Sequence, residues 1–241
     1  MIHRAGTDIV NWYLLEEGGK VTIVDAGCPA YRSQLEGALR DIGRTIEDVE
    51  AIVLTHAHID HVGFAKALQE ERGTPVHAHE GERPQAETGK PPPTEGSYVT
   101  AMLRHRTARR VVFHIARNGG ARPPKVANLS TFGDGDELDV PGRPRAIHTP
   151  GHSPGHCVLH VPAEGAAFTG DALCGWNTVT GAPGPTLPPP EFSNSMARAR
   201  DSLARIELID AQVLYYGHGD PWRGGAAAAV AEARTRDTRA A

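Results

Sequence analysis

Cysteine is scarce in this sequence, with three residues among 241. Cys28, Cys157 and Cys174 lie far apart, and an odd number of thiols leaves at least one unpaired, so no disulfide framework is expected. Small secreted domains that depend on disulfides are thereby excluded. We expect all three thiols to be reduced and to serve as small core residues, as most free cysteines do.

Long hydrophobic runs are also missing. The sequence contains no stretch of about twenty apolar residues that could cross a bilayer, and its first residues lack the apolar segment of a signal peptide. We therefore expect a soluble cytoplasmic protein without a membrane partner. Neither sign of charge dominates, since the formal net charge is -4, and we do not expect nucleic acid as a partner.

The chain does have enough apolar material for a sizeable core. Hydrophobic residues make up 39% of the sequence, which suits one domain spanning residues 1–241. Two apolar runs joined by Glu-Gly-Gly predict a β-hairpin over 11–24, and a helix capped by Ser33 follows over 33–42. Further along, the patterns predict a strand at 50–55, a helix at 62–72 and a strand at 75–79. This alternation is typical of an α/β fold.

The second half of the chain repeats this mixture of elements. Four short strands are expected at 136–140, 145–149, 156–161 and 166–173. A helix capped by Ser193 is predicted over 193–210, then a last strand from 211 whose loop carries His218, and a final helix from 224.

Residues from about 84 to 128 differ in character, and we call this segment the basic insert. Between positions 90 and 125 it holds six arginines and two lysines against a single acid, Glu95. Such runs are commonly solvated helical surface. Because insertions between core elements often carry substrate contacts, the basic insert is also a candidate lid over an active site. We expect a helical lid from about 96 to 118 whose apolar residues wall the pocket: Leu103, Val111, Val112, Phe113 and Ile115.

Residues 56 to 61 read HAHIDH and follow the apolar run AIVL. His56 and His58, two positions apart on an extended turn, can converge on one ion, whereas Asp60 and His61 can reach a second ion nearby. Imidazole together with carboxylate suits zinc, and catalytic zinc keeps one position open for water. So short a segment cannot fill two coordination shells, and the hypothesis therefore requires distant ligands. The candidates are His152 in TPGHSPGH, Asp171 in FTGDAL and His218 in YYGHGD.

Each distant candidate has an ordinary explanation when it is taken alone. A histidine in a Gly/Pro loop is commonly solvated, and an aspartate after a strand commonly forms a turn. Their joint occurrence changes this interpretation, because four glycine-flanked sites each follow an apolar, strand-like run. The pattern favours one shared metal centre at a sheet edge.

The set of motifs resembles the metallo-β-lactamase-fold superfamily. HAHIDH matches its H-x-H-x-D-H signature, and the resemblance continues through VDAG, TPGHSPGH, FTGDAL and GHGD, over about residues 10 to 220. It implies an α/β fold, a four-layer αββα sandwich of two mixed sheets, with a dinuclear site at the sheet edge. Asp25 matches a position that orients ligands without binding metal itself. The implied ligands are His56, His58 and His152 for the first metal, Asp60, His61 and His218 for the second, and Asp171 as a bridge.

Departures from individual branches narrow the expected function. A bridging Asp171 argues against antibiotic hydrolysis as the main activity. The chain resembles glyoxalase II enzymes in two motifs, yet only about twenty residues follow His218, where those enzymes carry a further domain. Acyl-homoserine lactonases share the ligand set but place a tyrosine where this sequence has Ala172, Leu173 and Cys174. The resemblance is therefore to a glyoxalase II-like or lactonase-like branch without that further domain.

We expect a dinuclear zinc hydrolase that uses a metal-bridging hydroxide to cleave a small ester, thioester or lactone, with iron or manganese as other candidate metals. Asp60 is the expected catalytic residue. The alternatives are a phosphodiesterase or nuclease of the same fold, and an iron-dependent oxidoreductase similar to persulfide dioxygenases. Arg109, Arg110 and Trp176 are candidate substrate contacts, and the arginines would favour an anionic acyl thioester. The sequence leaves the oligomeric state open and is compatible with a dimer.

Overall fold

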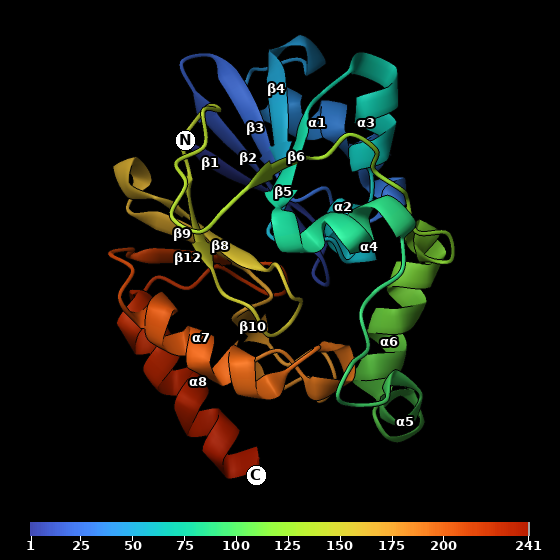
Figure 1. The fold of residues 1–241 in the computed structure, drawn as a ribbon, viewed down its shortest axis with the longest axis vertical. Helices are drawn as coiled ribbons and strands as arrows, with labels where there is room; N and C mark the ends of the chain where they lie inside the picture. The colour runs from blue at the N-terminus through green and yellow to red at the C-terminus, as the bar shows by residue number, and fades with distance from the viewer. Residues whose placement is uncertain (241) are drawn as a thin grey trace.

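The computed structural model describes residues 1–240 and contains two mixed β-sheets packed face to face (Figure 1). The first sheet has six strands, whose order in the sheet follows the sequence. Its first three strands pair antiparallel, and the following pairs are parallel. These strands are β1 (Ile2–Gly6), β2 (Asn11–Glu17), β3 (Lys20–Val24), β4 (Val49–Val53), β5 (Val76–His79) and β6 (Ser130–Phe132).

The second sheet has the strand order β12-β9-β8-β7, and only the β12-β9 pair is parallel. A separate antiparallel hairpin is formed by β10 and β11. The strands are β7 (Arg145–His148), β8 (Cys157–Val161), β9 (Ala166–Gly170), β10 (Cys174–Trp176), β11 (Pro183–Thr186) and β12 (Val213–Tyr216).

Alternation along β2 shows how the first sheet is buried on both faces. Tyr13 and Leu15 point between the sheets, where they join a cluster with Phe168 of β9. Leu14 belongs instead to the cluster on the opposite face, which also contains Leu68 of the helix α3 (Ala65–Arg72). Because successive strand residues point to opposite faces, a fully apolar strand predicts burial on both sides.

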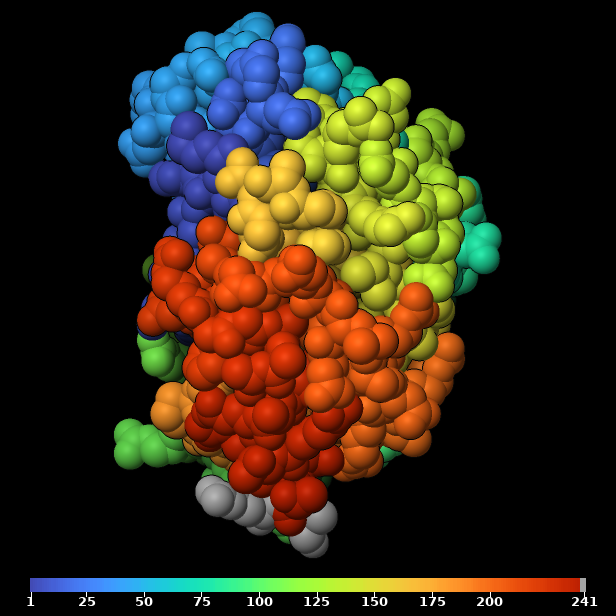
Figure 2. All heavy atoms as spheres, turned by 90° about the vertical axis from the view of Figure 1, so that its left-hand side faces the viewer, coloured from blue at the N-terminus to red at the C-terminus, as the bar shows by residue number. Residues whose placement is uncertain are grey.

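Helices cover the outer face of each sheet, which completes the expected αββα arrangement. The helices α1 (Leu35–Asp41) and α3 (Ala65–Arg72) pack on the first sheet. The helices α7 (Met196–Glu207) and α8 (Ala226–Ala240) pack on the second, and their orange and red atoms cover the lower part of the face shown in Figure 2. The remaining helices are α2 (Ile59–Val62), α4 (Arg83–Thr88), α5 (Tyr98–Arg104) and α6 (Arg106–Ile115). Among the described residues, no helix is long and apolar enough to cross a membrane.

Both predicted helix caps were wrong. Ser33 lies inside a 3-10 turn, Pro29–Gln34, because Pro29 starts a tight turn before α1 begins. The helix α7 is capped by Ser195, whose Oγ accepts a hydrogen bond from the Arg198 amide. Ser193 contacts His152 instead.

The strand expected at 136–140 is also absent as a strand. Only Glu137 makes an isolated bridge, to Arg145. The segment runs beside the edge strand β7, because the Gly135 amide bonds to the Ala146 carbonyl and the Ala146 amide to the Asp136 carbonyl. After Leu138 the Val140 amide bonds back to the Leu138 carbonyl, so the pairing with β7 stays too short to form a strand. The strands β1 and β6 and the β10-β11 hairpin were not predicted.

Candidate metal centre

Loops after four strands bring all seven predicted ligands together. Rigid strands hold these segments, which are loops except for the short helix α2 that carries Asp60 and His61. Four of the ligands follow β4, and the others follow β7, β9 and β12, respectively: His56, His58, Asp60 and His61; His152; Asp171; and His218.

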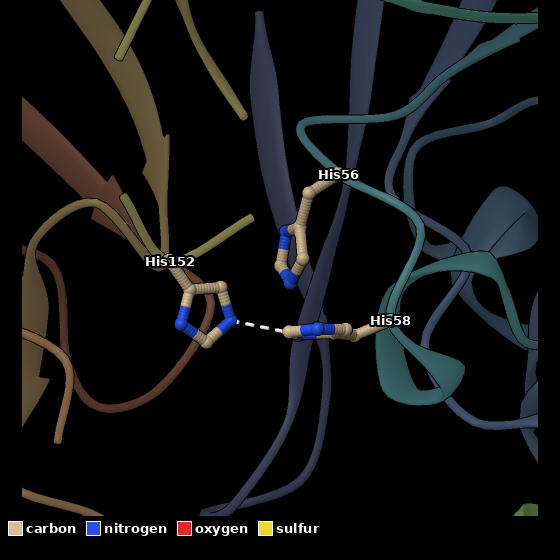
Figure 3. A group of neighbouring side chains, drawn as sticks. All are labelled: His56, His58 and His152. Carbon is tan, nitrogen blue, oxygen red and sulfur yellow. Dashed lines mark hydrogen bonds between the residues drawn. The ribbon is translucent and has the colours of Figure 1, made fainter. Parts of the chain in front are cut away.

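His56, His58 and His152 form the first group, with ligand nitrogens that all lie within 4.8 Å of one another (Figure 3). The ring centroid of His56 is 4.7 Å from each of the other two. His58 Nδ1 and His152 Nε2 are 2.8 Å apart. Three imidazoles thus converge from two loops that are far apart in the sequence.

Asp60, His61 and His218 form the second group, again with ligand atoms within 4.8 Å of one another. Asp171 lies between the groups. Its Oδ2 atom is 3.1 Å from His218 Nε2 and 3.4 Å from His152 Nε2, and its Oδ1 atom is 3.5 Å from His61 Nε2. One carboxylate therefore contacts both groups, as a bridging ligand requires.

Unsatisfied buried atoms show that these residues fit metal ions. His56 Nε2, His61 Nε2 and Asp171 Oδ1 are buried and have no hydrogen-bond partner among the described residues. Buried polar atoms are nearly always hydrogen-bonded, so three orphans at one place indicate a missing ligand. Nitrogen and carboxylate oxygen donors in this number suit two divalent ions.

The neutral state of the first group favours metal binding. Burial, helped by the neighbouring His61, lowers the pKa of His56 well below its usual value. Burial and the nearby His58 lower the pKa of His152 in the same way. These imidazoles are therefore neutral, which is the form that binds a metal.

The second group has a negative local potential. Burial by itself would lower the pKa of His61, but the carboxylates of Asp25 and Asp171 raise it to about 10. Burial also opposes protonation of His218, and Asp171 overcomes it and raises the pKa to about 9. Carboxylates that hold protons on buried histidines form a place where cations are stabilised.

Neighbouring groups fix the orientation of the ligand side chains. Asp25, directly after β3, accepts hydrogen bonds from the Thr55 amide at 2.8 Å and from His61 Nδ1 at 2.8 Å. His218 Nδ1 donates to the Ile9 carbonyl at 2.6 Å. Each bond leaves the Nε2 atom of its histidine directed at the cluster, the usual arrangement around metal ligands.

Ser193 acts in the same way on His152. Its Oγ atom donates to the Pro189 carbonyl and lies 3.3 Å from His152 Nδ1. The predicted helix cap is thus a residue that orients a ligand.

Glu82 was missed by the sequence analysis. It is 1% exposed, and its carboxylate accepts hydrogen bonds from the amides of Ala57 and Gly155 and from Ser153 Oγ, each at 2.7 Å. Ala57 lies between two ligands of the first group, and Ser153 follows the third. One buried acid therefore joins the two loops that carry that group. The Glu-Gly-Glu after the VHAH strand offers two acids, Glu80 and Glu82, and no motif marks the second one.

His156 is the second residue that the sequence analysis did not single out. Its Nε2 atom accepts hydrogen bonds from the amides of Asp171 and Ala172, at 3.0 and 3.2 Å. Burial lowers the pKa of His156 to about 3, so the ring stays neutral and keeps this acceptor. The repeated PGH in TPGHSPGH could have indicated it, because the first histidine was already assigned.

Comparison with known proteins decides the family. The model of the Metallo-beta-lactamase superfamily matches residues 5–218. The chain belongs to this superfamily. Two Bacillus subtilis relatives are named probable metallo-hydrolases: YflN is 24% identical, covering 92% of this chain and 85% of its own length, and YybB is 26% identical, covering 88% and 81%.

Solved structures of the superfamily share the fold of this chain. The metallo-beta-lactamase family protein TTHA1429 from Thermus thermophilus is 27% identical, with a TM-score of 0.68 over 99% of this chain and 79% of that one. TTHA1623, whose structure is described as a di-iron-bound form, is 24% identical with a TM-score of 0.61, over 92% of this chain and 94% of that one. The predicted resemblance and the predicted sandwich are therefore confirmed at the level of the superfamily.

A cavity of about 330 Å³ opens above the metal-ligand cluster of this superfamily member. Cluster residues form its floor, and the basic insert contributes Val111 and Ile115 of α6 to its wall. The expected wall was wrong for Leu103 and Phe113, which are 79% and 66% exposed, and Val112 is not among the lining residues. The helix α6 is amphipathic, and only the apolar side that faces the ligands lines the cavity.

The three predicted substrate contacts lie outside the lining of this cavity. Arg109 donates to the Met102 carbonyl, and Arg110 pairs with Asp8, at exposed positions. Arg110 and Trp176 line a second cavity, of about 500 Å³. None of the described residues that line the first cavity is lysine or arginine.

Proposed function

We propose that this chain is a dinuclear zinc hydrolase that cleaves a small ester, thioester or lactone. The observation that carries the proposal is the pair of ligand groups joined by Asp171 beneath a largely apolar cavity. The names of YflN and YybB support a metal-dependent hydrolase. Within the superfamily, we place the chain in the glyoxalase II-like or lactonase-like branch, because the bridging aspartate is present.

The chemistry divides between the metals and the chain. When bound by the two ligand groups, divalent ions supply a nucleophile at neutral pH and a Lewis acid for the carbonyl oxygen. Asp60, which lines the cavity and lies beside His218, can accept the proton that the nucleophile loses and pass it to the leaving group. Asp171 keeps the two ligand groups in fixed relation. The apolar wall excludes water from the acyl group.

The lining of the cavity indicates a neutral acyl group. Apolar residues such as Ile59, Val62 and Phe192 surround the space, and Glu191 is the acid at its wall outside the metal-ligand cluster. The arginines that suggested an anionic thioester lie elsewhere, so we propose neutral esters and lactones as the better substrates. A nuclease would need cationic groups near the ligands, and the described lining has none.

Zinc is our proposed metal because histidine and carboxylate ligands at both positions suit it. The di-iron form of TTHA1623 makes iron the principal competitor. Elemental analysis of protein purified without added metal distinguishes them: we expect two zinc ions per chain, whereas iron would favour the oxidoreductase alternative.

The test of function is hydrolysis by this metal-loaded protein of a panel of p-nitrophenyl esters, lactones, acyl thioesters and bis-p-nitrophenyl phosphate. Asp171→Ala should hold one ion or none and should lose hydrolysis, since its carboxylate contacts both groups. Asp201→Ala, at an exposed position of α7, is the matched control and should retain two ions and full hydrolysis. Turnover of the phosphodiester alone would overturn the proposal.

A further inference from the structure

A glutamine in the wall of the cavity has incomplete hydrogen bonding. Gln85 of α4 is 8% exposed and lines the cavity above the metal-ligand cluster. Its Oε1 atom is buried and has no hydrogen-bond partner among the described residues. Leaving such an atom unpaired destabilises a protein, so a buried carboxamide without a partner needs an explanation.

Two other polar groups of the cavity lining have an assignment. Thr94 Oγ1 donates to the Gly96 carbonyl at 2.9 Å. Asp171 Oδ1, which is also buried without a partner, belongs to the metal-ligand cluster. Gln85 Oε1 has no such assignment, and Gln85 belongs to neither ligand group.

The position of Gln85 is well fixed. Glu82, at the start of α4, is bonded to both loops of the first ligand group, and the Ala86 carbonyl accepts a hydrogen bond from the Val126 amide. These bonds hold the backbone of Gln85 at a fixed position relative to the metal-ligand cluster, and specific recognition requires such a fixed position. Its carboxamide can offer either a donor or an acceptor after rotation of the terminal group.

We propose that Gln85 determines substrate specificity by hydrogen-bonding a hydroxyl or amide group on the acyl part of the substrate. This inference rests on the proposed function, since the metal-ligand cluster acts on the carbonyl while Gln85 reads the acyl chain. An otherwise apolar cavity typically uses a few polar groups to orient its ligand. A site built to bond a polar group rejects the analogue that lacks it, because its own buried group is then unpaired.

The test compares wild type with Gln85→Met, which keeps the length of the side chain and removes its polar atoms. Substrates are p-nitrophenyl hexanoate and its analogues with one hydroxyl, moved one carbon at a time along the chain. Wild type should prefer the best hydroxylated ester by at least about tenfold in kcat/KM, and Gln85→Met should lose that preference. The melting temperature of the free variant should be unchanged or higher. Gln69→Met on α3, outside the cavity lining, is the matched control and should keep the preference.

Binding of the corresponding carboxylic acids separates this inference from the proposed function. If no ester is hydrolysed but the hydroxy acid raises the melting temperature of wild type more than hexanoic acid does, and Gln85→Met removes the difference, Gln85 keeps its role and the proposed function fails. Absence of any preference in wild type, in both assays, would overturn the inference. The inference would also be overturned if Gln85→Met and Gln85→Leu lowered kcat/KM equally for the hydroxylated and the unsubstituted ester and had a lower melting temperature. That pattern indicates a structural role.

Discussion

At the scale of single residues, Asp60 belongs to a ligand group and also lines the cavity. Asp60→Asn keeps the shape and removes the charge, so we expect turnover to fall by about two orders of magnitude or more, the usual contribution of one catalytic group. Steady-state kinetics together with metal analysis check this. Asp201→Asn on the exposed side of α7 serves as control. Near-wild-type turnover with both ions bound would reduce Asp60 to a passive ligand.

Glu82 gives a second residue-scale prediction. Glu82→Gln removes the buried charge and replaces one acceptor oxygen with a donor, which then faces backbone amides or Ser153 Oγ. We expect metal affinity to fall by roughly ten- to a hundredfold, as loss of a supporting group around a metal commonly causes. Titration of Zn²⁺ into apoprotein measures the affinity. Glu80→Gln, exposed in the same turn, should bind like wild type. Equal affinities in both variants would show that Glu82 serves the fold alone.

At the scale of elements, the glycine that links β12 to His218 permits close approach of the ligand groups. A Cβ atom on Gly217 would lie 2.2 Å from Asp171 Oδ1 and 2.5 Å from His61 Cε1. Gly217→Ala should therefore displace the bridging carboxylate and lower metal content, as read by elemental analysis. Gly37→Ala in α1 meets no atom closer than 3.9 Å and should keep full metal content. Full occupancy in Gly217→Ala would mean that the β12 loop can move aside.

The basic insert shows where sequence patterns reach their limit at this scale. Its helices were expected and are present as α5 and α6. Its apolar residues could not be sorted by sequence, because which side of a helix faces the ligands depends on how the helix docks. Val111 and Ile115 line the cavity, whereas Phe113 between them is exposed.

At the scale of the whole molecule, burial should protect every cysteine. Cys28, Cys157 and Cys174 are free and at most 1% exposed, and burial raises the pKa of each thiol. We expect no reaction with Ellman's reagent in the native protein. After unfolding in guanidinium, all three thiols should react, and the absorbance of the released thiolate measures them. Rapid labelling of one thiol without unfolding would mean that part of the core opens readily.

From the sequence by itself, the resemblance to the superfamily predicted the sandwich, and the motifs predicted the candidate ligands. Apolar strands of period two predict sheets buried on one or both faces, and HAHIDH with three glycine-flanked partners predicts a metal centre, because both signals are local. Glu82 and Gln85 carry no local signal, and the signal for His156 is limited to the repeated PGH. Glu82 contacts Ala57, 25 positions away, and His156 contacts Asp171, 15 positions away, whereas Gln85 acts in the wall of the cavity. Only the packing of the loops creates these contacts. The tertiary structure likewise decided that Arg109 and Arg110 lie on the surface. The charges in a sequence do not show which side of a helix will face the cavity.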